Sequence, residues 1–401
     1  MNITTKTIEP EKMKTLKLIN YVDIIIILTG IALAIAIRYS LIDYKSFDFI
    51  KDTKGWYNTV KEQGFSAFGH KFSDYNPPYL YLLYLIARIF PDSSAVLATK
   101  LPSMIADFVS AWFAYRIVRL KYDNAAIPIL AAFAILFAPT IIINSAFWGQ
   151  FDALYTCSLL ATLYFVFTKK YGPAMLMFGL SVSFKAQAVF LFPFLIALLI
   201  NKMIPWKYYL LIPLVMLLVL IPAWIAGRPL LDLLLIYPSQ TGSYKQLTMN
   251  APSVFSLVPA SGRFYIYFYH AALISAVAAG IFFSILVSKS QIKLTPSILL
   301  ELALITVLII PFILPKMHER YFYSADVISI IFAFYFPRYL FVPIIMSLIS
   351  IFSYLPTLFA IEPIPLSLLA LGIFVLIVFL SRDAIIHLFP VSPGDRTLET
   401  Q

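Results

Sequence analysis

The chain has 401 residues, of which 61% are hydrophobic, 16% aromatic and only 12% charged. A soluble fold of this length has too little interior to bury so much apolar surface, so the composition predicts a polytopic membrane protein and excludes a disordered chain, a coiled coil and a disulfide scaffold. The net charge of +10 is scattered between apolar runs without a basic tract, which favours membrane topology and anionic lipid headgroups as its origin and argues against nucleic acid as a partner.

Apolar runs that approach the length of a membrane span recur along the whole chain. A bilayer core needs about 20 apolar residues per helix. The first run follows a polar segment, 1–18, and no small-residue cleavage site comes after it, so we expect a retained span and not a signal peptide. The fold class is therefore all-α, a transmembrane bundle over 19–381 with a tail at 382–401. About twelve spans are predicted, at 19–38, 98–118, 126–143, 152–168, 172–184, 187–201, 208–226, 265–287, 296–314, 322–336, 338–356 and 364–381.

Basic residues in the short connections predict the orientation of the bundle. With the N-terminus inside, 16 of the 30 Lys and Arg residues fall in inside segments. Eight of the other 14 lie in one long stretch, 38–100, which the positive-inside rule discounts. We therefore expect a multi-pass protein of the cell membrane with both termini in the cytoplasm.

The long first external loop, about 39–97, is the segment in which function is most expected. A loop of this length in a compact protein is usually functional or disordered, and its many Trp, Tyr and Phe residues argue against disorder. We expect short amphipathic helices at the outer surface. The stretch from Pro77 to Phe90 is apolar but too short for a span, which is typical of an interfacial or re-entrant helix.

Three polar clusters interrupt the apolar sequence on the predicted outer side. They are the acidic first loop, NSAFWGQFD (Asn144–Asp152) and PKMHERYFY (Pro315–Tyr323). Ionisable groups at membrane depth are costly and by default indicate function. Because all three clusters face one side, we expect them to form a single extracytoplasmic site.

These segments resemble a known family of membrane enzymes. The runs YNPPYLYLLYL, KLPSMIADFVSAWFAYRIVR, NSAFWGQFDALY, FKAQAVFLFPFLIAL and MHERYFY occur in this order. They are similar to the prokaryotic mannosyltransferases related to the second mannosyltransferase of GPI-anchor synthesis, which belong to the GT-C superfamily. The resemblance covers roughly residues 20–335. It implies transfer of a hexose, mannose first of all, from a polyprenyl-phosphate donor to an acceptor hydroxyl on the outer face, with inversion.

The resemblance also implies that an acidic residue in the first external loop is the general base. The family usually has S-G-D-Y there, and this chain has Ser46-Phe47-Asp48-Phe49, with Phe in place of Gly and Tyr. The chemistry requires such an acid in any case, because a sugar hydroxyl is a poor nucleophile until a carboxylate accepts its proton. We take Asp48 as the base and keep Asp43 and Asp52 as alternatives.

The other substrate groups call for different side chains. The leaving group is a lipid phosphate, and Arg and Lys stabilise the charge that it develops. Candidate phosphate ligands near the outer face are Lys185, Arg263, Lys316 and Arg320. Candidates for contacting the sugar or orienting the base are Tyr75, Asn76, Trp148, Gln150, Asp152, His318 and Glu319.

Each candidate also has an ordinary structural explanation. Asp48 fits a solvated loop carboxylate, and Asp74 fits a cap for the helix that starts at Pro77. Trp148 fits an interfacial anchor, and Asp152 fits the N-cap of the next span. Within the third cluster, residues 318–320 fit an interfacial group of salt bridges. Glu301, near the cytoplasmic start of its span, is expected to be unrelated to the site.

Sequence signatures of cofactors are not found. The four histidines and the single Cys157 lack metal-ligand spacing, and the acids of the first loop are a weak signal for a divalent ion, so a metal has no motif support. A glycine-rich phosphate loop is also missing, which favours a lipid-linked donor over a nucleotide sugar.

The acceptor stays open between a glycan, a glycolipid and a protein, and two other classes of protein remain as alternatives. One is a secondary transporter or lipid-linked sugar flippase, for which about twelve spans are typical, although its ionisable residues usually lie at the bilayer midplane. The other is a subunit of a glycan-export assembly without catalysis, against which the external acids argue.

Overall fold

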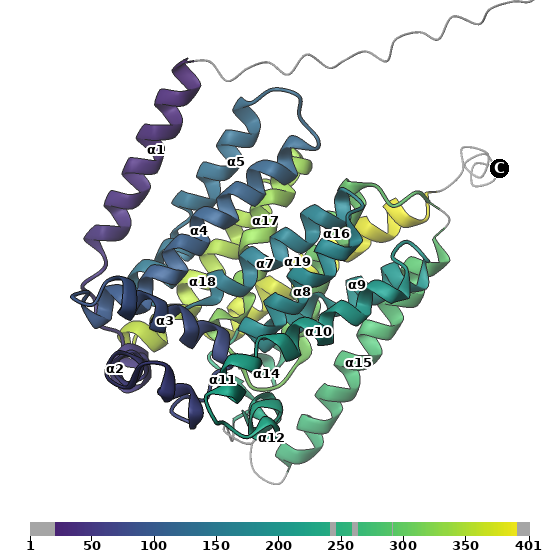
Figure 1. The fold of residues 1–401 in the computed structure, drawn as a ribbon. Coiled ribbons are helices and arrows are strands. Elements are labelled where there is room, and N and C mark those ends of the chain that lie inside the picture. Colours follow the sequence, from purple (N-terminus) through teal and green to yellow (C-terminus); the bar gives the residue numbers. More distant parts are fainter. Residues whose placement is uncertain (1–20, 241–245, 259–263, 291, 391–401) are drawn as a thin grey trace, which may run out of the picture.

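Apolar runs punctuated by proline form helices throughout the computed structural model, which describes residues 21–240, 246–258, 264–290 and 292–390 (Figure 1). Proline occupies the first turn of many of these helices, where its missing N–H is not needed. The helices of the first half are α1 (Tyr21–Ser40), η1 (Phe49–Thr53), α2 (Lys54–Gln63), η2 (Gly64–Gly69), α3 (Pro77–Ile89), α4 (Ala95–Arg119), α5 (Ala126–Phe137), α6 (Pro139–Ile142), η3 (Ile143–Trp148), α7 (Asp152–Phe167), α8 (Tyr171–Phe184), η4 (Ala186–Leu191) and α9 (Phe192–Ile200).

The second half continues the same pattern, with one short pair of strands. Its elements are η5 (Trp206–Leu210), α10 (Leu211–Leu218), α11 (Ile221–Ile225), α12 (Leu230–Leu234), α13 (Ile236–Gln240), β1 (Thr248–Met249), α14 (Val254–Leu257), α15 (Tyr265–Lys289), α16 (Pro296–Ile313), β2 (Met317–His318), η7 (Glu319–Phe322), α17 (Tyr323–Tyr335), η8 (Pro337–Tyr339), α18 (Phe341–Phe359) and α19 (Leu366–Leu388). Strands β1 and β2 pair in parallel, with Thr248 opposite Met317.

The membrane-protein prediction agrees with these helices. Each of the twelve predicted spans falls on a helix or on adjoining helices. Among the described residues, six helices are long and apolar enough to cross a membrane, and a seventh crossing results if the pair α5 and α6–η3, bent by 47° at Pro139, counts as one. Helices α7, α8 and η4–α9 are apolar but shorter. The number of twelve spans therefore stays a prediction, whereas the polytopic helical architecture is confirmed.

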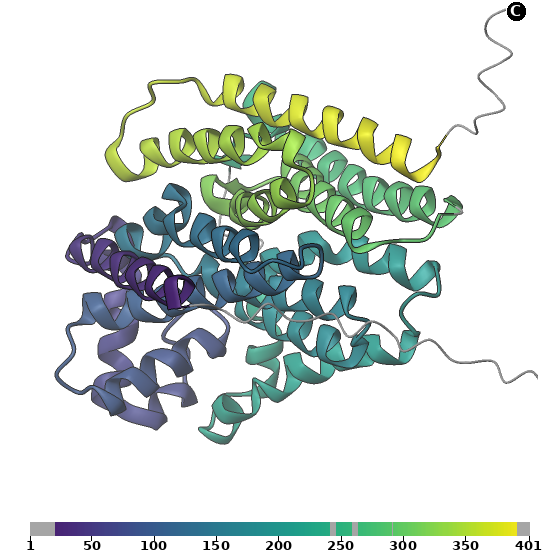
Figure 2. The same ribbon diagram turned by 90° about the horizontal axis from the view of Figure 1, so that it is seen from above.

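A central group of helices forms the core, and α1 stands at its edge (Figures 1 and 2). Helix α7 packs against α4 and α8, α4 packs against α5, and α16 packs against α17 and α19. Nearly all of α7 is buried, whereas α1 exposes most of its isoleucine and leucine side chains. A helix that is apolar all round is typical of a membrane span, so the exposed face of α1 suits lipid contact.

The predicted folding of the first external loop is confirmed. It contains η1, α2, η2 and α3, which lie at one end of the bundle together with α11, α12 and α14 (Figure 1). The expected cap by Asp74 is wrong: the residue before α3 is Asn76, its side chain does not cap the helix either, and Asp74 pairs with Lys71 at 2.9 Å on the surface. The proline at the first turn of α3 already fixes the helix start.

Buried ions join α1 to the core directly before this loop begins. Arg38, at the end of α1, pairs with Asp107 of α4 at 2.9 Å, and both side chains are buried. Ser145 of η3 donates a hydrogen bond to the same carboxylate at 2.6 Å. A buried charge is tolerated only when it is paired and hydrogen-bonded, so this contact fixes where the first loop starts relative to α4 and η3.

Candidate active site

The first loop lies at one end of the bundle (Figure 1), and its residues contribute to the lining of a cavity of about 540 Å³. It brings together the three polar clusters that the sequence places on one side. Most of its lining comes from the first loop, the turn after η3, the start of η4, the segment around β1, and β2 with η7, and α13 and α18 add one residue each. The residues of the lining that bear charge are Asp48, Lys51, Asp52, Asp74, Lys185, Glu319 and Arg320, with His318 beside them.

Asp48 lies directly before the turn η1 and is held by the second cluster. The indole Nε1 of Trp148 donates to Asp48 Oδ2 at 3.1 Å, and the amide of Gln150 donates to the same oxygen at 2.5 Å. Among the described residues, none makes a hydrogen bond to Oδ1. Two donors on one oxygen orient the carboxylate and leave its second oxygen to accept a proton.

The turn that carries these donors has an unusual backbone. After the bend at Pro139 the chain forms the π-helical turn η3, and Gly149 then adopts a left-handed conformation with φ 81°. This turn places Trp148 inward with 1% of its surface exposed, so the interfacial-anchor alternative for Trp148 is wrong. The reversal also lets Trp148 and Gln150 reach the same carboxylate from two sides of one glycine.

Asp152 lies behind the cavity wall and not in its lining. It is fully buried, and its two oxygens accept from Lys185 Nζ at 2.5 Å and from Asn144 Nδ2 at 3.0 Å. The alternative that Asp152 is the N-cap of α7 is wrong, because Phe151 occupies the cap position and no side-chain cap bond forms. Asp152 therefore positions the cation Lys185, which itself lines the cavity.

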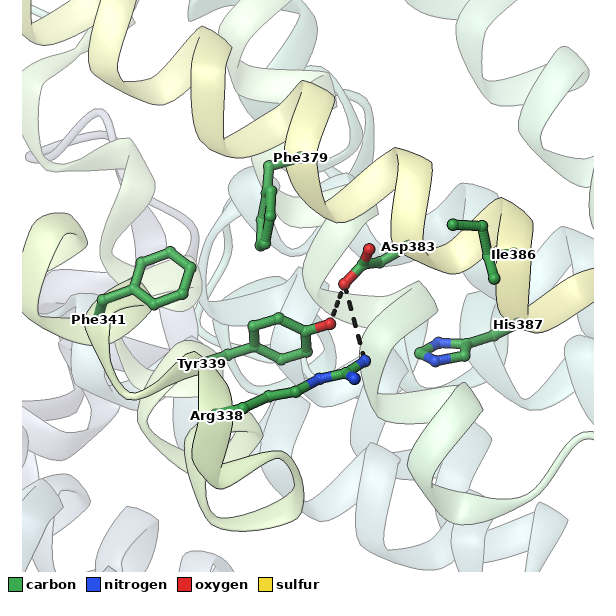
Figure 3. Close-up of a pocket in the computed structure, with 7 residues that line it drawn as sticks. All are labelled: Arg338, Tyr339, Phe341, Phe379, Asp383, Ile386 and His387. Atoms are coloured by element: carbon green, nitrogen blue, oxygen red, sulfur yellow. Dashed lines mark hydrogen bonds and ion pairs between the residues drawn. The ribbon is translucent and has the colours of Figure 1, made fainter.

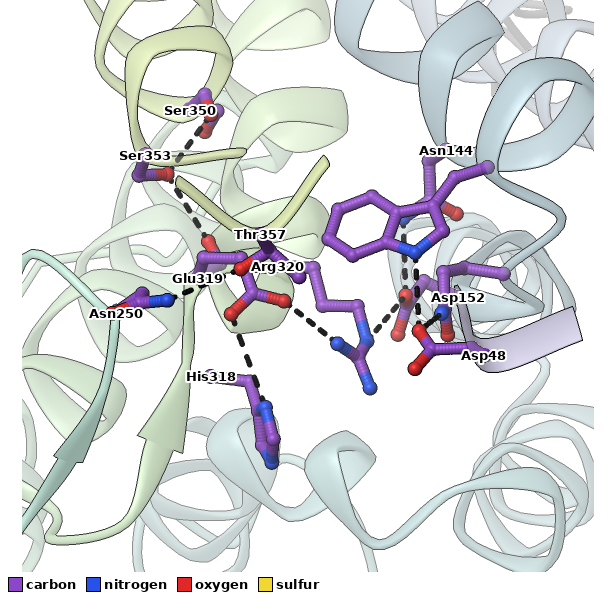
Figure 4. Close-up of polar contacts among 12 residues, drawn as sticks. Asp48, Asn144, Asp152, Asn250, His318, Glu319, Arg320, Ser350, Ser353 and Thr357 are labelled. Carbon is purple, nitrogen blue, oxygen red and sulfur yellow. Dashed lines mark hydrogen bonds and ion pairs between the residues drawn. The ribbon is translucent and has the colours of Figure 1, made fainter. Parts of the chain in front are cut away.

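The third cluster supplies a second buried cation. Arg320 Nη1 donates to Glu319 Oε1 at 2.7 Å, and Arg320 Nε lies 3.8 Å from Asp152 Oδ2 (Figure 4). Nε is buried and has no hydrogen-bond partner among the described residues. Glu319 and Arg320 do form the salt bridge of the structural alternative, but they do so in the cavity wall. Figure 4 shows the guanidinium between His318 and Glu319 on one side and Asp48 and Asp152 on the other.

The cations and the burial shift the protonation of their neighbours. Burial, together with the charges of Arg320 and Lys185, lowers the pKa of His318 to about 2, so the imidazole is neutral at physiological pH. Burial raises the pKa of Glu319, and the charge of Arg320 opposes that rise. Burial also raises the pKa of Asp52, while Lys51 lowers it and Asp48 raises it. Because His318 is neutral near physiological pH, it adds no positive charge to the wall beside Lys185 and Arg320.

Several predicted site residues lie elsewhere. Asp43 is exposed and does not line the cavity. Lys316 places its ammonium over the ring of Tyr269, 4.8 Å from the ring centre, and Asn76 is buried with its amide donating to Ser183 O at 2.8 Å. Tyr75 does line the cavity. Arg263 lies outside the described residues.

Sequence reasoning missed part of the lining. The missed residues include Lys51, Thr53, Trp56, Phe151, Ala186, Gln187, Tyr237, Gln246, Met249, Asn250, Tyr321 and Thr357. Asn250 and His318 are brought together by a bridge next to the β1–β2 pair, a contact across almost 70 residues. No local pattern announces a two-residue strand pair, although MHERYFY already contained Tyr321.

A second cavity, of about 500 Å³, differs in chemistry and is lined by residues of η8, α18 and α19 (Figure 3). There Arg338 lies 3.9 Å from Asp383, and Tyr339 donates to the same carboxylate. Nearby, His387 contacts Glu301 at 2.8 Å, away from the first cavity as expected for Glu301. In the described chain, no group of three or more His, Cys, Asp or Glu side chains is arranged to hold a metal ion.

Known proteins share parts of this architecture. Residues 74–225 match the family model described as dolichyl-phosphate-mannose-protein mannosyltransferase. A crystal structure of ArnT from Cupriavidus metallidurans bound to undecaprenyl phosphate is similar, with a TM-score of 0.56 at 13% identity over 90% of this chain and 73% of that chain. The apo crystal structure of the same ArnT gives a TM-score of 0.39 at 12% identity over 91% and 78%. No curated protein matches this sequence.

The matched segment runs from α3 to α11 and includes Trp148, Asp152 and Lys185. This match and the similarity to the fold of ArnT fit the polytopic membrane glycosyltransferase of the GT-C superfamily that the motifs of the sequence predict. The transporter and flippase alternatives are accordingly not favoured.

Proposed function

We propose that this glycosyltransferase moves a hexose, with mannose as the first candidate, from a polyprenyl-phosphate donor to an acceptor hydroxyl at the extracytoplasmic face. The family description names a dolichyl-phosphate-mannose enzyme, and ArnT was crystallised with undecaprenyl phosphate. The acceptor belongs to a glycan, a glycolipid or a protein. The observation that carries the proposal is that one cavity contains an oriented carboxylate, Asp48, and two buried cations, Lys185 and Arg320.

The carboxylate suits the acceptor hydroxyl, and the two cations suit the phosphate that leaves. The acceptor oxygen attacks the anomeric carbon and loses its proton to Asp48, whose free oxygen faces no protein donor among the described residues. The bond between the anomeric carbon and the phosphate oxygen breaks, and its electron pair stays on the lipid phosphate. Attack opposite the departing phosphate inverts the anomeric centre.

Lys185 and Arg320 are suited to the phosphate that leaves. Each is paired with a carboxylate, Lys185 with Asp152 and Arg320 with Glu319, so both buried cations have a counter-charge. Arg320 still has a buried Nε without a hydrogen-bond partner in the described part of the chain. Charge-assisted bonds from fixed donors in a partly dry site stabilise a developing phosphate charge better than water does. Gln187 and Tyr321, in the same lining, suit the sugar hydroxyls.

Exchange of Asp48 for asparagine tests the base. Asp48→Asn keeps an oxygen for Trp148 and Gln150 but cannot accept the proton, so we expect transfer of radiolabel from polyprenyl-phosphate mannose in membranes to fall about 10²- to 10⁴-fold. Asp52→Asn is the matched control from the same loop and the same cavity, and we expect it to retain activity. Full transfer by a folded Asp48→Asn protein, or loss in Asp52→Asn alone, contradicts the assignment.

A further inference from the structure

Lys100 of α4 is fully buried, and its ammonium contacts backbone carbonyl groups instead of a carboxylate. Its ammonium donates to three backbone carbonyl oxygens, those of Ile42 and Tyr44 at 2.8 Å and that of Phe147 at 2.9 Å. No ion pair of Lys100 with a carboxylate is found among the described residues. An ammonium has three donors, and here three carbonyls take them. A buried cation without a carboxylate is costly, so a specific use for this contact is expected.

The three carbonyls belong to the two segments that meet at Asp48. Tyr44 lies four residues before Asp48 in the first loop, and Phe147 directly precedes Trp148, whose indole holds the Asp48 carboxylate. Two further contacts join the same segments. Ser46 Oγ donates to Trp148 O at 2.8 Å, and the rings of Tyr44 and Phe147 stack with centres 3.9 Å apart.

Gly149 gives an independent sign that the turn is built against this lysine. With φ at 81°, its backbone strongly favours glycine, and a Cβ there would lie 3.2 Å from both Cγ and Cε of Lys100. The turn that presents Trp148 and Gln150 therefore rests on the aliphatic stem of Lys100, while the ammonium holds the carbonyl before it. Ile42, Met104 and Ala146 form a small apolar cluster around this region.

From these contacts we infer that Lys100 is a positioning residue for the general base of the proposed function. Its ammonium fixes the first loop and the turn at 147–150 relative to each other, so that Trp148 and Gln150 meet Asp48 in one geometry. Lys100 does not line the cavity and touches no substrate. Its contribution is to the chemical step, because a misplacement of about 1 Å in a catalytic group costs about 10²-fold in rate.

Lys100→Met tests this role, because methionine keeps an unbranched apolar stem and removes the ammonium. We expect the kcat for transfer from radiolabelled polyprenyl-phosphate mannose to fall about 10- to 100-fold, while the KM for this donor changes less than about threefold. Lys121→Met is the matched control, since Lys121 donates to a backbone carbonyl, that of Tyr335, at the other end of the same molecule. It should keep kcat within about twofold of the parent.

A double-mutant cycle distinguishes positioning from a general structural effect. If Lys100 acts through Asp48, adding Lys100→Met to Asp48→Asn changes the residual rate by less than about threefold. An equal loss in both backgrounds, an unchanged kcat in Lys100→Met, or a rise in donor KM alone overturns the inference.

Ser46→Ala is the second test variant if Lys100→Met does not yield folded protein. It removes the hydrogen bond to Trp148 O and leaves the ammonium in place. We expect a loss of kcat that is again absent in the Asp48→Asn background, and an unchanged kcat overturns the inference. Full activity of Asp48→Asn itself refutes the proposed base and this inference together, whereas an Asp48-dependent enzyme with normal Lys100→Met activity refutes the role of Lys100 alone.

Discussion

Two nitrogen donors converge on one oxygen of Asp48, and this asymmetry separates Asp48 from the other acids of its loop. Asp43 is exposed away from the cavity, and Asp52 lies in the lining with a raised pKa caused by its burial. A carboxylate with a raised pKa is a stronger base but is ionised in a smaller fraction of molecules. The geometry favours Asp48, because only its carboxylate is oriented by the second polar cluster.

Neutral His318 gives a prediction about pH. The pKa of its imidazole is lowered to about 2 in the folded protein and is near 6.5 in the unfolded chain. Between these values the unfolded state binds a proton that the folded state does not, so stability falls as the pH drops below 6.5. At pH 5 this amounts to about 2 kcal/mol.

His318→Gln removes the titrating group and should flatten this dependence. We expect the melting temperature in detergent micelles to fall less between pH 7 and pH 5 in the variant than in the parent. The raised pKa of Glu319 acts with the opposite sign, because the folded state then takes up its proton first as the pH falls. The difference between parent and variant isolates the histidine, and equal pH dependence in both would contradict its low pKa.

Short irregular elements, more than the long helices, shape the site. The turn η3 ends at the left-handed Gly149, η1 follows Asp48, and the β1–β2 pair places His318 beside Asn250. Long apolar helices supply rigid supports for these elements. Sites built on such supports keep the geometry that catalysis requires.

The packing of α8 on α10 gives a prediction at the scale of helices. A Cβ on Gly179 of α8 would lie 3.0 Å from both the carbonyl oxygen of Ile212 and the Cβ of Val215 in α10. We expect Gly179→Ala to force these helices apart and to lower the unfolding free energy by about 1–3 kcal/mol. Thermal unfolding in detergent micelles measures this change.

Gly55→Ala in α2 is the matched control for the same exchange. A Cβ on Gly55 would meet no atom within 4 Å, so alanine there should be neutral or stabilise the helix by about 0.5–1 kcal/mol. A melting temperature of Gly179→Ala at or above that of the parent would show that α8 and α10 have room between them.

At the scale of the molecule, the two ends of the bundle differ. The first loop, which contributes to the candidate active site, lies at one end, and the connection after α7, which contains Lys169 and Lys170, lies at the other (Figure 1). The positive-inside rule predicts that these lysines lie in the cytoplasm and that the cavity lies outside.

Cysteine labelling tests this orientation. The native Cys157 is replaced by alanine, and a single cysteine is introduced at Asp92 in the first loop or at Lys170, both of which are exposed. We expect an impermeant maleimide to label Asp92→Cys in intact cells and Lys170→Cys only after permeabilisation. The Cys157→Ala protein alone should stay unlabelled. The reverse pattern would place the proposed site in the cytoplasm.

The sequence by itself determined that this is a polytopic membrane protein and where most of its helices lie. Apolar length and proline position are local properties, so each of the twelve predicted spans lies on helix, and the aromatic first loop is folded. Bends and short turns were not predictable in the same way, because the 47° break at Pro139 and the turn at Gly149 depend on what they pack against.

Only the tertiary structure decided which polar residues meet. It separated Asp48 from Asp43, paired Asp152 with Lys185, left Asp74 on the surface and revealed Lys100 beneath the turn. These outcomes depend on distances between residues tens to hundreds of positions apart. A buried charge must find a partner in three dimensions, and no local pattern in the chain specifies which partner that is.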